Sequence, residues 1–440
     1  MRYWRRSILL AIFSVFVAFP ASAGLGPSNH MLWYSLMTPT DFYLLPVHAW
    51  LEKNDPQAAL QTLIKGIPQG PLGSPVPSNV RVLGVTVKDR LATVDLSSEI
   101  LQAPVGAATE AIMIGAMVNT ITATPDIQRV QFTVEGEVVE SLGGHISAEG
   151  PFERSMSQMY QGFPDVASHW AEGQVNAFVL RGIIEGYPDG TFKPQWQVTR
   201  EEFIKLVVAS LELEDLQRKT PSFTDVPVSR WSSPHVERGV QQGLIRPADY
   251  GATLEPGNPI PRKEMAVILA RAAGLDEPPE GSTGWYPDLG GLTDLETDYV
   301  LACTEAGLLE GYEDGTFRPN GYLTRAEAST VMVRLTGMGG PDIFVAFPRS
   351  GNSFNPSEPL LVMGTARTFE GNVLIQLLDG ETQLDTTFVT ATEGMGWGVF
   401  AALAPWPEGQ APSKPKVRVF WESPQDGRDL SSVLIPLTVD

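Results

Sequence analysis

The chain has 440 residues, which exceeds the size of a single hydrophobic core and predicts about three domains. Its formal net charge of −20 argues against nucleic acid as a partner and against unspecific adhesion to anionic polymers, because like charges repel. Its single cysteine, Cys303, excludes an internal disulfide, and we expect a buried thiol there.

The first 23 residues have the pattern of a secretory signal peptide. Basic residues precede an apolar stretch from Ser7 to Phe19, and Ala21-Ser-Ala23 supplies the small residues of a cleavage site. An uncleaved anchor is the alternative, but about 13 apolar residues are too few to span a bilayer. No cysteine follows this stretch, so we expect no lipid anchor. The pattern predicts an exported chain without a transmembrane anchor after cleavage.

Residues 30–153 predict one unit of the α+β class. Strands are expected over 30–36 and 42–47, and a hairpin over 80–96 turns at Asp89 and Arg90. A helix over 54–66 has an Asx cap, proline in its first turn and Gly66 at its end. A second helix over about 107–121 and a last hairpin over 130–139 complete the unit. One sheet covered by two helices is the simplest packing.

This unit resembles the GerMN domain of spore-germination and sporulation proteins. The matching residues include Ala58-Ala-Leu, Val82-Leu-Gly-Val, Val118-Asn-Thr and Gly143-Gly-His145. The activity of that family is poorly defined, and envelope or peptidoglycan association is the usual suggestion, so the resemblance implies no catalytic residue. For His145, no Ser or Cys motif lies nearby to serve as a nucleophile. We therefore predict a turn or hydrogen-bonding role for this histidine.

The middle of the chain is a triple repeat. A motif that begins at Gly182 as Gly-Ile-Ile-Glu-Gly-Tyr-Pro-Asp-Gly-Thr-Phe-Lys-Pro returns from Gly307 with few changes, and a divergent copy begins at Gly243. Each copy begins with an aromatic residue, any residue and an aspartate, and its apolar spacing predicts two helices after this entry. Three arginines recur at a spacing of roughly 62 residues, the signature of an internal repeat: Arg200, Arg262 and Arg325.

Each of these arginines lies in the first turn of a predicted helix. In two copies its neighbours fit a capping box, namely Thr199 with Glu202 and Thr324 with Glu327. Capping does not explain the arginine, since a cation in the first turn opposes the helix macrodipole. A guanidinium beside free backbone amides makes an anion site for a carboxylate or phosphate. The alternative is an ion pair within this acidic chain, and both interpretations stay open.

The repeats resemble the S-layer homology (SLH) family through the entry Phe163-Pro-Asp-Val-Ala-Ser-His-Trp-Ala, the Gly-Tyr-x-Asp-Gly-Thr-Phe-x-Pro turn and the Thr-Arg-x-Glu helix start. The resemblance implies an all-α triple-repeat bundle with copies at 162–215, 222–275 and 285–338. It also implies inter-repeat grooves that bind secondary cell-wall polymers, often through pyruvylated sugars. Carried over by position, the polymer-binding candidates are Trp170, Arg200, Trp231, Arg262 and Arg325.

The middle and last copies depart from the family pattern. Copy two has Pro261 in place of the capping Thr and lacks the Asp-Gly turn, and copy three has no Trp at the family position. We therefore expect fewer than three working grooves, with Trp170 and Arg200 as the safest pair, although a core role for the Trp is equally open. The stretch 277–284 is expected to be a surface loop, and 337–341 a hinge that lets the domains reorient.

From residue 342 to 440 the pattern changes to strands alone. About seven short apolar segments, parted by turns such as Asp379-Gly380, predict an all-β immunoglobulin-like sandwich held by apolar packing. The segments Phe347-Pro-Arg-Ser-Gly, Gly364-Thr-Ala-Arg-Thr-Phe-Glu-Gly and Glu422-Ser-Pro-Gln-Asp-Gly resemble the Gmad2 domain. That module also occurs in sporulation and germination proteins. The sequence thus predicts a multidomain protein of α+β, all-α and all-β parts.

Sequence patterns of enzymes are absent from the chain. It has no Cys/His spacing for zinc, no P-loop and no Gly-x-Ser-x-Gly, so we expect no catalytic residue, metal or cofactor. We expect a non-catalytic protein of the bacterial cell wall or surface that binds a secondary cell-wall polymer, including a pyruvylated one, or peptidoglycan. Its outer domains would meet envelope proteins of unknown identity. A peptidoglycan-acting enzyme tethered by the repeats is the alternative, and a structural lattice subunit is a third.

Overall fold

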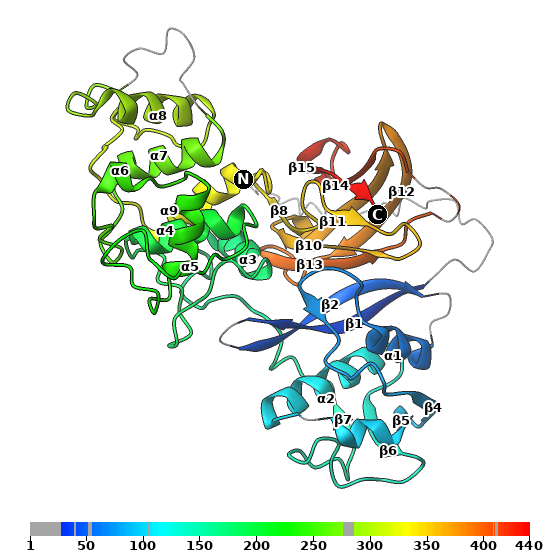
Figure 1. Cartoon of the computed structure of the whole chain (residues 1–440). Coiled ribbons are helices and arrows are strands. Elements are labelled where there is room, and N and C mark those ends of the chain that lie inside the picture. The colour runs from blue at the N-terminus through cyan, green and yellow to red at the C-terminus, as the bar shows by residue number, and fades with distance from the viewer. Residues whose placement is uncertain are drawn as a thin grey trace, which may run out of the picture.

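The computed structural model describes residues 28–38, 41–51, 55–103, 105–275, 286–407, 409 and 412–440. The predicted signal peptide and the predicted loop at 277–284 lie outside these residues. Figure 1 shows three regions: an N-terminal region in blue and cyan, a helical region in green and yellow, and a C-terminal β-rich region in orange and red. The protein is therefore multidomain, with a mixed α/β N-terminal region and a β-rich C-terminal region.

The N-terminal region contains most of the predicted elements. Asp55 caps α1 by accepting a hydrogen bond from the backbone N–H of Gln57, and Gly66 ends this helix at a φ of +80°. The hairpin of β4 and β5 turns at Asp89 and Arg90, both with positive φ. The elements are β1 (Ser28–Met37), β2 (Phe42–Leu51), α1 (Pro56–Lys65), β3 (Leu72–Gly73), β4 (Val82–Lys88), β5 (Leu91–Leu96), η1 (Ser98–Gln102), α2 (Ala107–Ile121), β6 (Arg129–Val134) and β7 (Phe152–Glu153).

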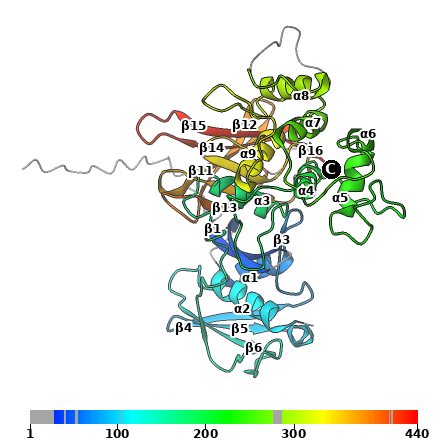
Figure 2. The same cartoon turned by 90° about the vertical axis from the view of Figure 1, so that its left-hand side faces the viewer.

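The expectation of a single sheet in this region is wrong. Strands β4, β5, β6 and β7 form one sheet, while β1 and β2 belong to another. Helices α1 and α2 lie between the two layers, as Figure 2 shows. Helix α2 is apolar around most of its circumference because both of its sides are covered. The expected last hairpin is also wrong, since β6 is followed only by a bridge from Val134 to Glu137 and pairs with β7.

Residues 162–338, here called the repeat block, are helical between their loops. In each copy the second helix packs against the first helix of the next copy: α4 on α5, α7 on α8, and α9 back on α3. Single β-bridges join the loops of different copies, as between Gln197 and Thr324. The helices are α3 (Glu172–Leu180), α4 (Arg200–Ser210), α5 (Ser233–Gln241), α6 (Pro247–Tyr250), α7 (Arg262–Ala272), α8 (Asp294–Glu305) and α9 (Arg325–Thr336).

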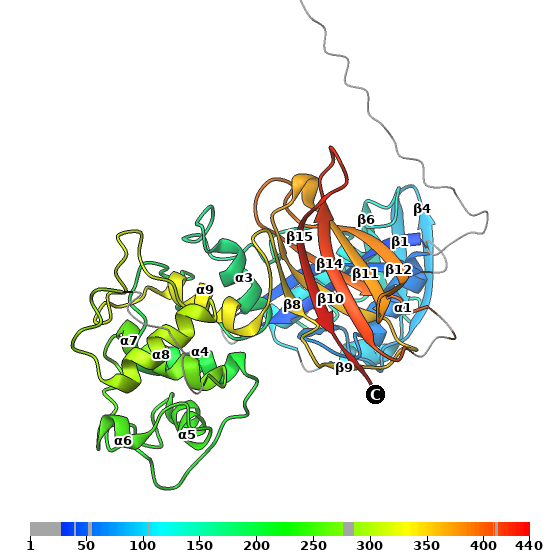
Figure 3. The same ribbon diagram turned by 90° about the horizontal axis from the view of Figure 1, so that it is seen from above.

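The C-terminal region is a two-layered β-sandwich. Figure 3 shows β15, β14, β11 and β12 side by side as one layer, and β8, β10 and β13 form the other. Buried side chains such as Val373, Val419 and Phe400 fill the space between the layers. The elements are β8 (Ile343–Phe347), β9 (Ser353–Phe354), β10 (Leu360–Ala366), η2 (Phe369–Gly371), β11 (Asn372–Asp379), β12 (Thr382–Thr390), β13 (Gly398–Ala404), β14 (Pro415–Glu422), β15 (Asp429–Pro436) and β16 (Thr438–Val439).

Strands from both ends of the chain share one six-stranded sheet, in the order β3-β1-β2-β13-β10-β8. Strand β2 pairs in parallel with β13, so that His48 lies opposite Ala402 and Ala49 opposite Leu403. Every residue of β10 and β13 is buried, on both faces of the sheet. The N-terminal region is therefore continuous with the C-terminal sandwich.

The predicted hinge between the repeat block and the sandwich lies in a hydrogen-bonded turn. The backbone N–H of Gly340 donates to the carbonyl of Ile343 at 3.0 Å, and that of Val345 donates to the carbonyl of Met338 at 2.9 Å. A β carbon on Gly339 would lie 2.2 Å from the carbonyl oxygen of Ile343, so the chain turns back closely on itself. This stretch is a tight, hydrogen-bonded turn between the end of α9 and the start of β8.

The thiol of Cys303 is fully buried in α8 and donates to the carbonyl of Ala266 at 3.3 Å. Burial raises the pKa of this thiol to about 12. We predict that Cys303 does not react with a soluble thiol reagent at pH 8, because both access and thiolate are lacking. Absorbance of the released reagent checks this, with the denatured protein as the positive control. Rapid reaction of the native protein would contradict the packing of α8 on α7.

Candidate functional site

The aromatic-x-Asp entry of each copy fixes the turn that follows its first helix. Asp165 accepts two backbone hydrogen bonds, from Phe192 at 2.8 Å and from Lys193 at 2.7 Å. These bonds hold Lys193 at a φ of +59°, a left-handed conformation that is uncommon outside glycine. The same pair of bonds occurs in the other two copies. Asp225 accepts from the backbone N–H groups of Leu254 and Glu255 in copy two, and Asp288 accepts from those of Phe317 and Arg318 in copy three. The motif's aspartate is thus structural.

Capping boxes begin the second helices of copies one and three. The side chain of Thr199 accepts from the backbone N–H of Glu202, and the carboxylate of Glu202 accepts from the backbone N–H of Thr199 at 2.9 Å. Thr324 and Glu327 repeat this arrangement at the start of α9. Helix α7 follows Pro261 and has no side-chain cap.

A groove of about 240 Å³ lies where three copies meet, and we call it the first groove. Its lining comes from the turn of copy one, helix α4, the entry to α5 and the start of α9. Lining residues with functional groups are Glu185, Tyr187, Glu202, Lys205, Trp231, Arg325 and Ser329. No single copy could make this groove, because the arginine, the lysine and the tryptophan each belong to a different copy.

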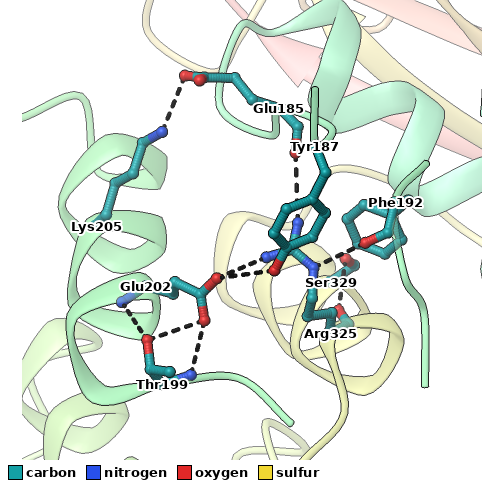
Figure 4. Close-up of polar contacts among 8 residues, drawn as sticks. All are labelled: Glu185, Tyr187, Phe192, Thr199, Glu202, Lys205, Arg325 and Ser329. Carbon is teal, nitrogen blue, oxygen red and sulfur yellow. Dashed lines mark hydrogen bonds and ion pairs between the residues drawn. The ribbon is translucent and has the colours of Figure 1, made fainter. Parts of the chain in front are cut away.

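Arg325 closes one side of the first groove and is anchored mainly by the backbone, as Figure 4 shows. Its Nε donates to the carbonyl of Phe192 at 2.9 Å and its Nη2 to the carbonyl of Glu185 at 3.3 Å. Its Nη1 pairs with Glu202 at 2.9 Å. The guanidinium lies over the rings of Tyr187 and Phe192. Arg325 is therefore a fixed positive charge, with its side chain only 13 % exposed.

Lys205 is the second cation of the first groove. Its Nζ pairs with Glu185 at 2.9 Å, and both side chains are partly exposed to solvent. Two aromatic groups complete the groove. Trp231 is 51 % exposed, and Tyr187 also lines the groove, with a pKa that burial raises. A lysine, an aromatic face and a phenol around a fixed guanidinium can bind an anionic sugar.

Arg200 lies in a different groove of about 490 Å³, here called the second groove. Both oxygens of Glu264 accept from its Nε, at 2.9 and 3.0 Å, and Glu255 lies 3.4 Å from its Nη1. Burial raises the pKa of Glu264 despite this arginine. Val267 lines the groove one repeat after Lys205, and Leu295 lines it at the position of the missing tryptophan. Arg200 therefore forms an ion pair within the chain, which was one of the two interpretations of its sequence position.

Arg262 of copy two contacts backbone carbonyls of copy three, as Arg325 of copy three contacts those of copy one. Its Nε donates to the carbonyl of Phe317 at 2.9 Å and its Nη2 to that of Glu310 at 2.7 Å. The arginine is 6 % exposed, and burial lowers its pKa. Trp170 is 54 % exposed, but it is not among the described residues that line either groove. The structure therefore does not bring the expected pair of Trp170 and Arg200 together.

Lys205, Glu185 and Tyr187 were not predicted as site residues. Lys205 lies three residues after Glu202 on α4, and residues at this spacing share one helix face. That spacing was the sequence signal that could have identified Lys205.

Away from the repeats, Glu110 accepts from the backbone N–H groups of Gly143 and His145, and the imidazole of His145 contacts the carbonyl of Val105. A hydrogen-bonding role for His145 is confirmed.

Three family models match this chain. Residues 35–140 match Germane, described as sporulation and spore germination, and residues 342–428 match Gmad2, described as the immunoglobulin-like domain of bacterial spore germination. Residues 162–204 and 286–329 match the S-layer homology domain. The chain thus carries a Germane segment, two matched SLH segments and a Gmad2 segment, at the positions predicted from the sequence.

Curated relatives match parts of this chain. A cellulosome-anchoring protein of Acetivibrio thermocellus is 41% identical over 27% of this chain and 26% of its own length. S-layer protein EA1 of Bacillus anthracis is 31% identical over 38% of this chain and 19% of its own length. An amylopullulanase of Thermoanaerobacterium thermosulfurigenes is 28% identical over 44% of this chain and 10% of its own length. The chain thus spans well under two thirds of these relatives.

Among solved structures, the tandem GerMN domains of the sporulation protein GerM from Bacillus subtilis are 22% identical, with a TM-score of 0.26. The match covers 31% of this chain and 50% of the solved chain. Within the described residues, no helix is long and apolar enough to cross a membrane.

The capping box of α9 positions Arg325 and offers a stability test. We predict that Thr324→Ala lowers the free energy of unfolding by about 1 kcal/mol, because a backbone N–H of the first turn loses its acceptor. Urea unfolding followed by circular dichroism measures this. Thr220→Ala, in an exposed loop, is the control and should change little. Equal stability of both variants would show that the cap is dispensable.

Proposed function

We propose that this protein is an exported, non-catalytic cell-wall protein, and that its first groove binds an anionic glycopolymer of the wall. The observation that carries the proposal is the groove itself, where Arg325, Lys205 and the exposed Trp231 converge from three copies. The two matched SLH segments, and relatives named as S-layer and cellulosome-anchoring proteins, support cell-wall anchoring.

The proposed binding mode assigns a task to each side chain. Arg325 keeps its backbone partners and contributes a fixed positive potential. Lys205 exchanges its partly exposed partner Glu185 for the ligand's carboxylate, a low-cost exchange because ion pairs in contact with solvent are worth about 0–1 kcal/mol. Trp231 stacks on the apolar face of a sugar ring. An acidic sugar, including one with a pyruvyl group, fits this set.

The second groove is proposed not to take this ligand. Asp249, Glu255, Glu264 and Glu296 outnumber the cations Arg200 and Lys263 among its lining residues. Glu296 already pairs with Lys263 at 2.9 Å, and Glu264 with Arg200. An added carboxylate would meet this excess of negative charge, whereas in the first groove Arg325 and Lys205 balance Glu202 and Glu185. We therefore move the proposed site from Arg200 to Arg325, while Arg262 and Trp170 stay candidates for a further groove.

We further propose that residues 162–215, 222–275 and 285–338 are three copies of one SLH bundle. The family model matches the first and third copies only. The pairing of α4 with α5, α7 with α8 and α9 with α3 supports a middle copy, because the ring of contacts needs it. The outer regions are proposed to bind envelope proteins involved in sporulation or germination.

Binding to wall sacculi tests the first groove. We predict that Lys205→Ala and Trp231→Ala each weaken co-sedimentation of the full chain about tenfold or more. The lysine variant loses a charge-assisted hydrogen bond worth about 1.5–3 kcal/mol, and the tryptophan variant loses the surface on which the sugar ring stacks. Matched controls are Lys219→Ala in an exposed loop and Leu295→Ala in the second groove, and both should bind normally. Sacculi stripped of their non-peptidoglycan polymer should retain no protein. Unchanged binding of both groove variants would overturn the site.

The absence of catalysis has its own test. We predict that the full chain releases no soluble muropeptides from sacculi above a buffer blank, because Ser329, Lys205, Glu185 and Glu202 of the first groove are each held in a hydrogen bond or ion pair and are not arranged as a nucleophile with its base. Chromatography of the supernatant measures this, with lysozyme as a positive control. Release of muropeptides by the full chain above the buffer blank would favour the tethered enzyme.

A further inference from the structure

The two ends of the chain meet in a joint that neither end could form alone. His48 on β2 is 8 % exposed and lies opposite Ala402 of β13. Its Nδ1 is 3.1 Å from Oδ1 of Asn29, within the N-terminal region, and its Nε2 is 3.3 Å from the carbonyl of Thr390, at the end of β12. One imidazole therefore bonds to both ends of the chain.

A second joint docks the repeat block on the same sandwich. Arg181, just after α3, donates to the backbone carbonyls of Val345 and Ala346 at 3.2 and 3.1 Å. The hydroxyl of Thr365 on β10 donates to the carbonyl of Gly173 at 3.0 Å. A β carbon on Gly173 would lie 2.5 Å from the indole of Trp397, so α3 lies against this ring as closely as only glycine allows.

Separation of the repeat block from the sandwich would leave buried polar groups without partners. Thr365 is 1 % exposed, and burial lowers the pKa of Arg181 to about 10. An arginine buried without hydrogen bonds is strongly unfavourable, and its acceptors here are the carbonyls of another region. Helix α3 also packs against β8 and β10, and all residues of β10 and β13 are buried. Domains joined by large apolar contacts do not move freely.

We propose that the protein is a rigid bracket, with the C-terminal sandwich at its centre and the N-terminal region and repeat block docked on one sheet of it. The sandwich fixes the angle between the two arms. A wall-bound repeat block would then hold the N-terminal region at a set orientation to the wall, which a flexible tether would not do. The bracket does not depend on the proposed ligand of the first groove.

Distances between paired spin labels in the full chain test the bracket. Exposed positions for cysteine labels are Val87 on β4, Val228 in the repeat block and Leu434 on β15, and the buried Cys303 stays unlabelled. The expected result is a single narrow distance distribution for the pair 87 and 434 and for the pair 228 and 434. Broad distributions in this protein would overturn the bracket.

Two variants separate the joints. Gly173→Leu should broaden the distribution between 228 and 434 and leave that between 87 and 434 narrow, because the leucine drives α3 from Trp397. His48→Glu should broaden the distribution between 87 and 434 and leave that between 228 and 434 narrow, because it buries a carboxylate beside the carbonyl of Thr390 in the strand joint. Circular dichroism and an unreactive Cys303 control for folding. Narrow distributions in both variants would overturn the assignment of rigidity to these joints.

Amide hydrogen exchange of the unsubstituted chain needs no variant. Amides of β2 and β13 should exchange within about tenfold of those of β11 and β14 in the sandwich core, since exchange in a rigid joint requires opening of the same cooperative unit. Exchange of β2 and β13 that is a thousandfold faster than that of β11 and β14 would overturn the bracket.

Discussion

The parallel pairing of β2 with β13 is the contact on which the architecture depends. Strands β10 and β13 present apolar residues to both faces, one facing the sandwich core and the other facing outward. Water on the outer face would cost roughly 25 cal/mol for each Å² of exposed apolar surface. The N-terminal strands lengthen this sheet, and α3 covers its outer face through Gly173 and Arg181. Three regions therefore share one continuous hydrophobic core.

The repeat block uses one residue type for two purposes. Arginine has five N–H donors in a fixed fork, so Arg325 and Arg262 each hold two carbonyls of the neighbouring copy and lie over its aromatic rings. Arg200 has the same place on its helix but is held by carboxylates. The character of each groove is thus set by residues around the arginine, such as Lys205 in the first groove and Val267 in the second.

Local sequence signals predicted most elements because their causes are local. The Asp55 cap, the turn at Asp89 and Arg90 and the capping boxes at Thr199 and Thr324 each satisfy backbone groups within a few residues. The single sheet was wrong because β2 finds its partner some 350 residues away, and the close turn of Gly339 on Ile343 was not foreseen. No periodicity encodes either contact.

The sequence by itself determined the three kinds of region, the repeat spacing and the helix starts that carry the arginines, because hydrophobic period, turn residues and caps act over short range. Only the tertiary structure decided which arginine, lysine and tryptophan share a groove, since these come from three different copies. It alone showed that Arg200 is neutralised by Glu264. Side-chain partners across copies depend on how helices pack, and packing is a property of the whole core.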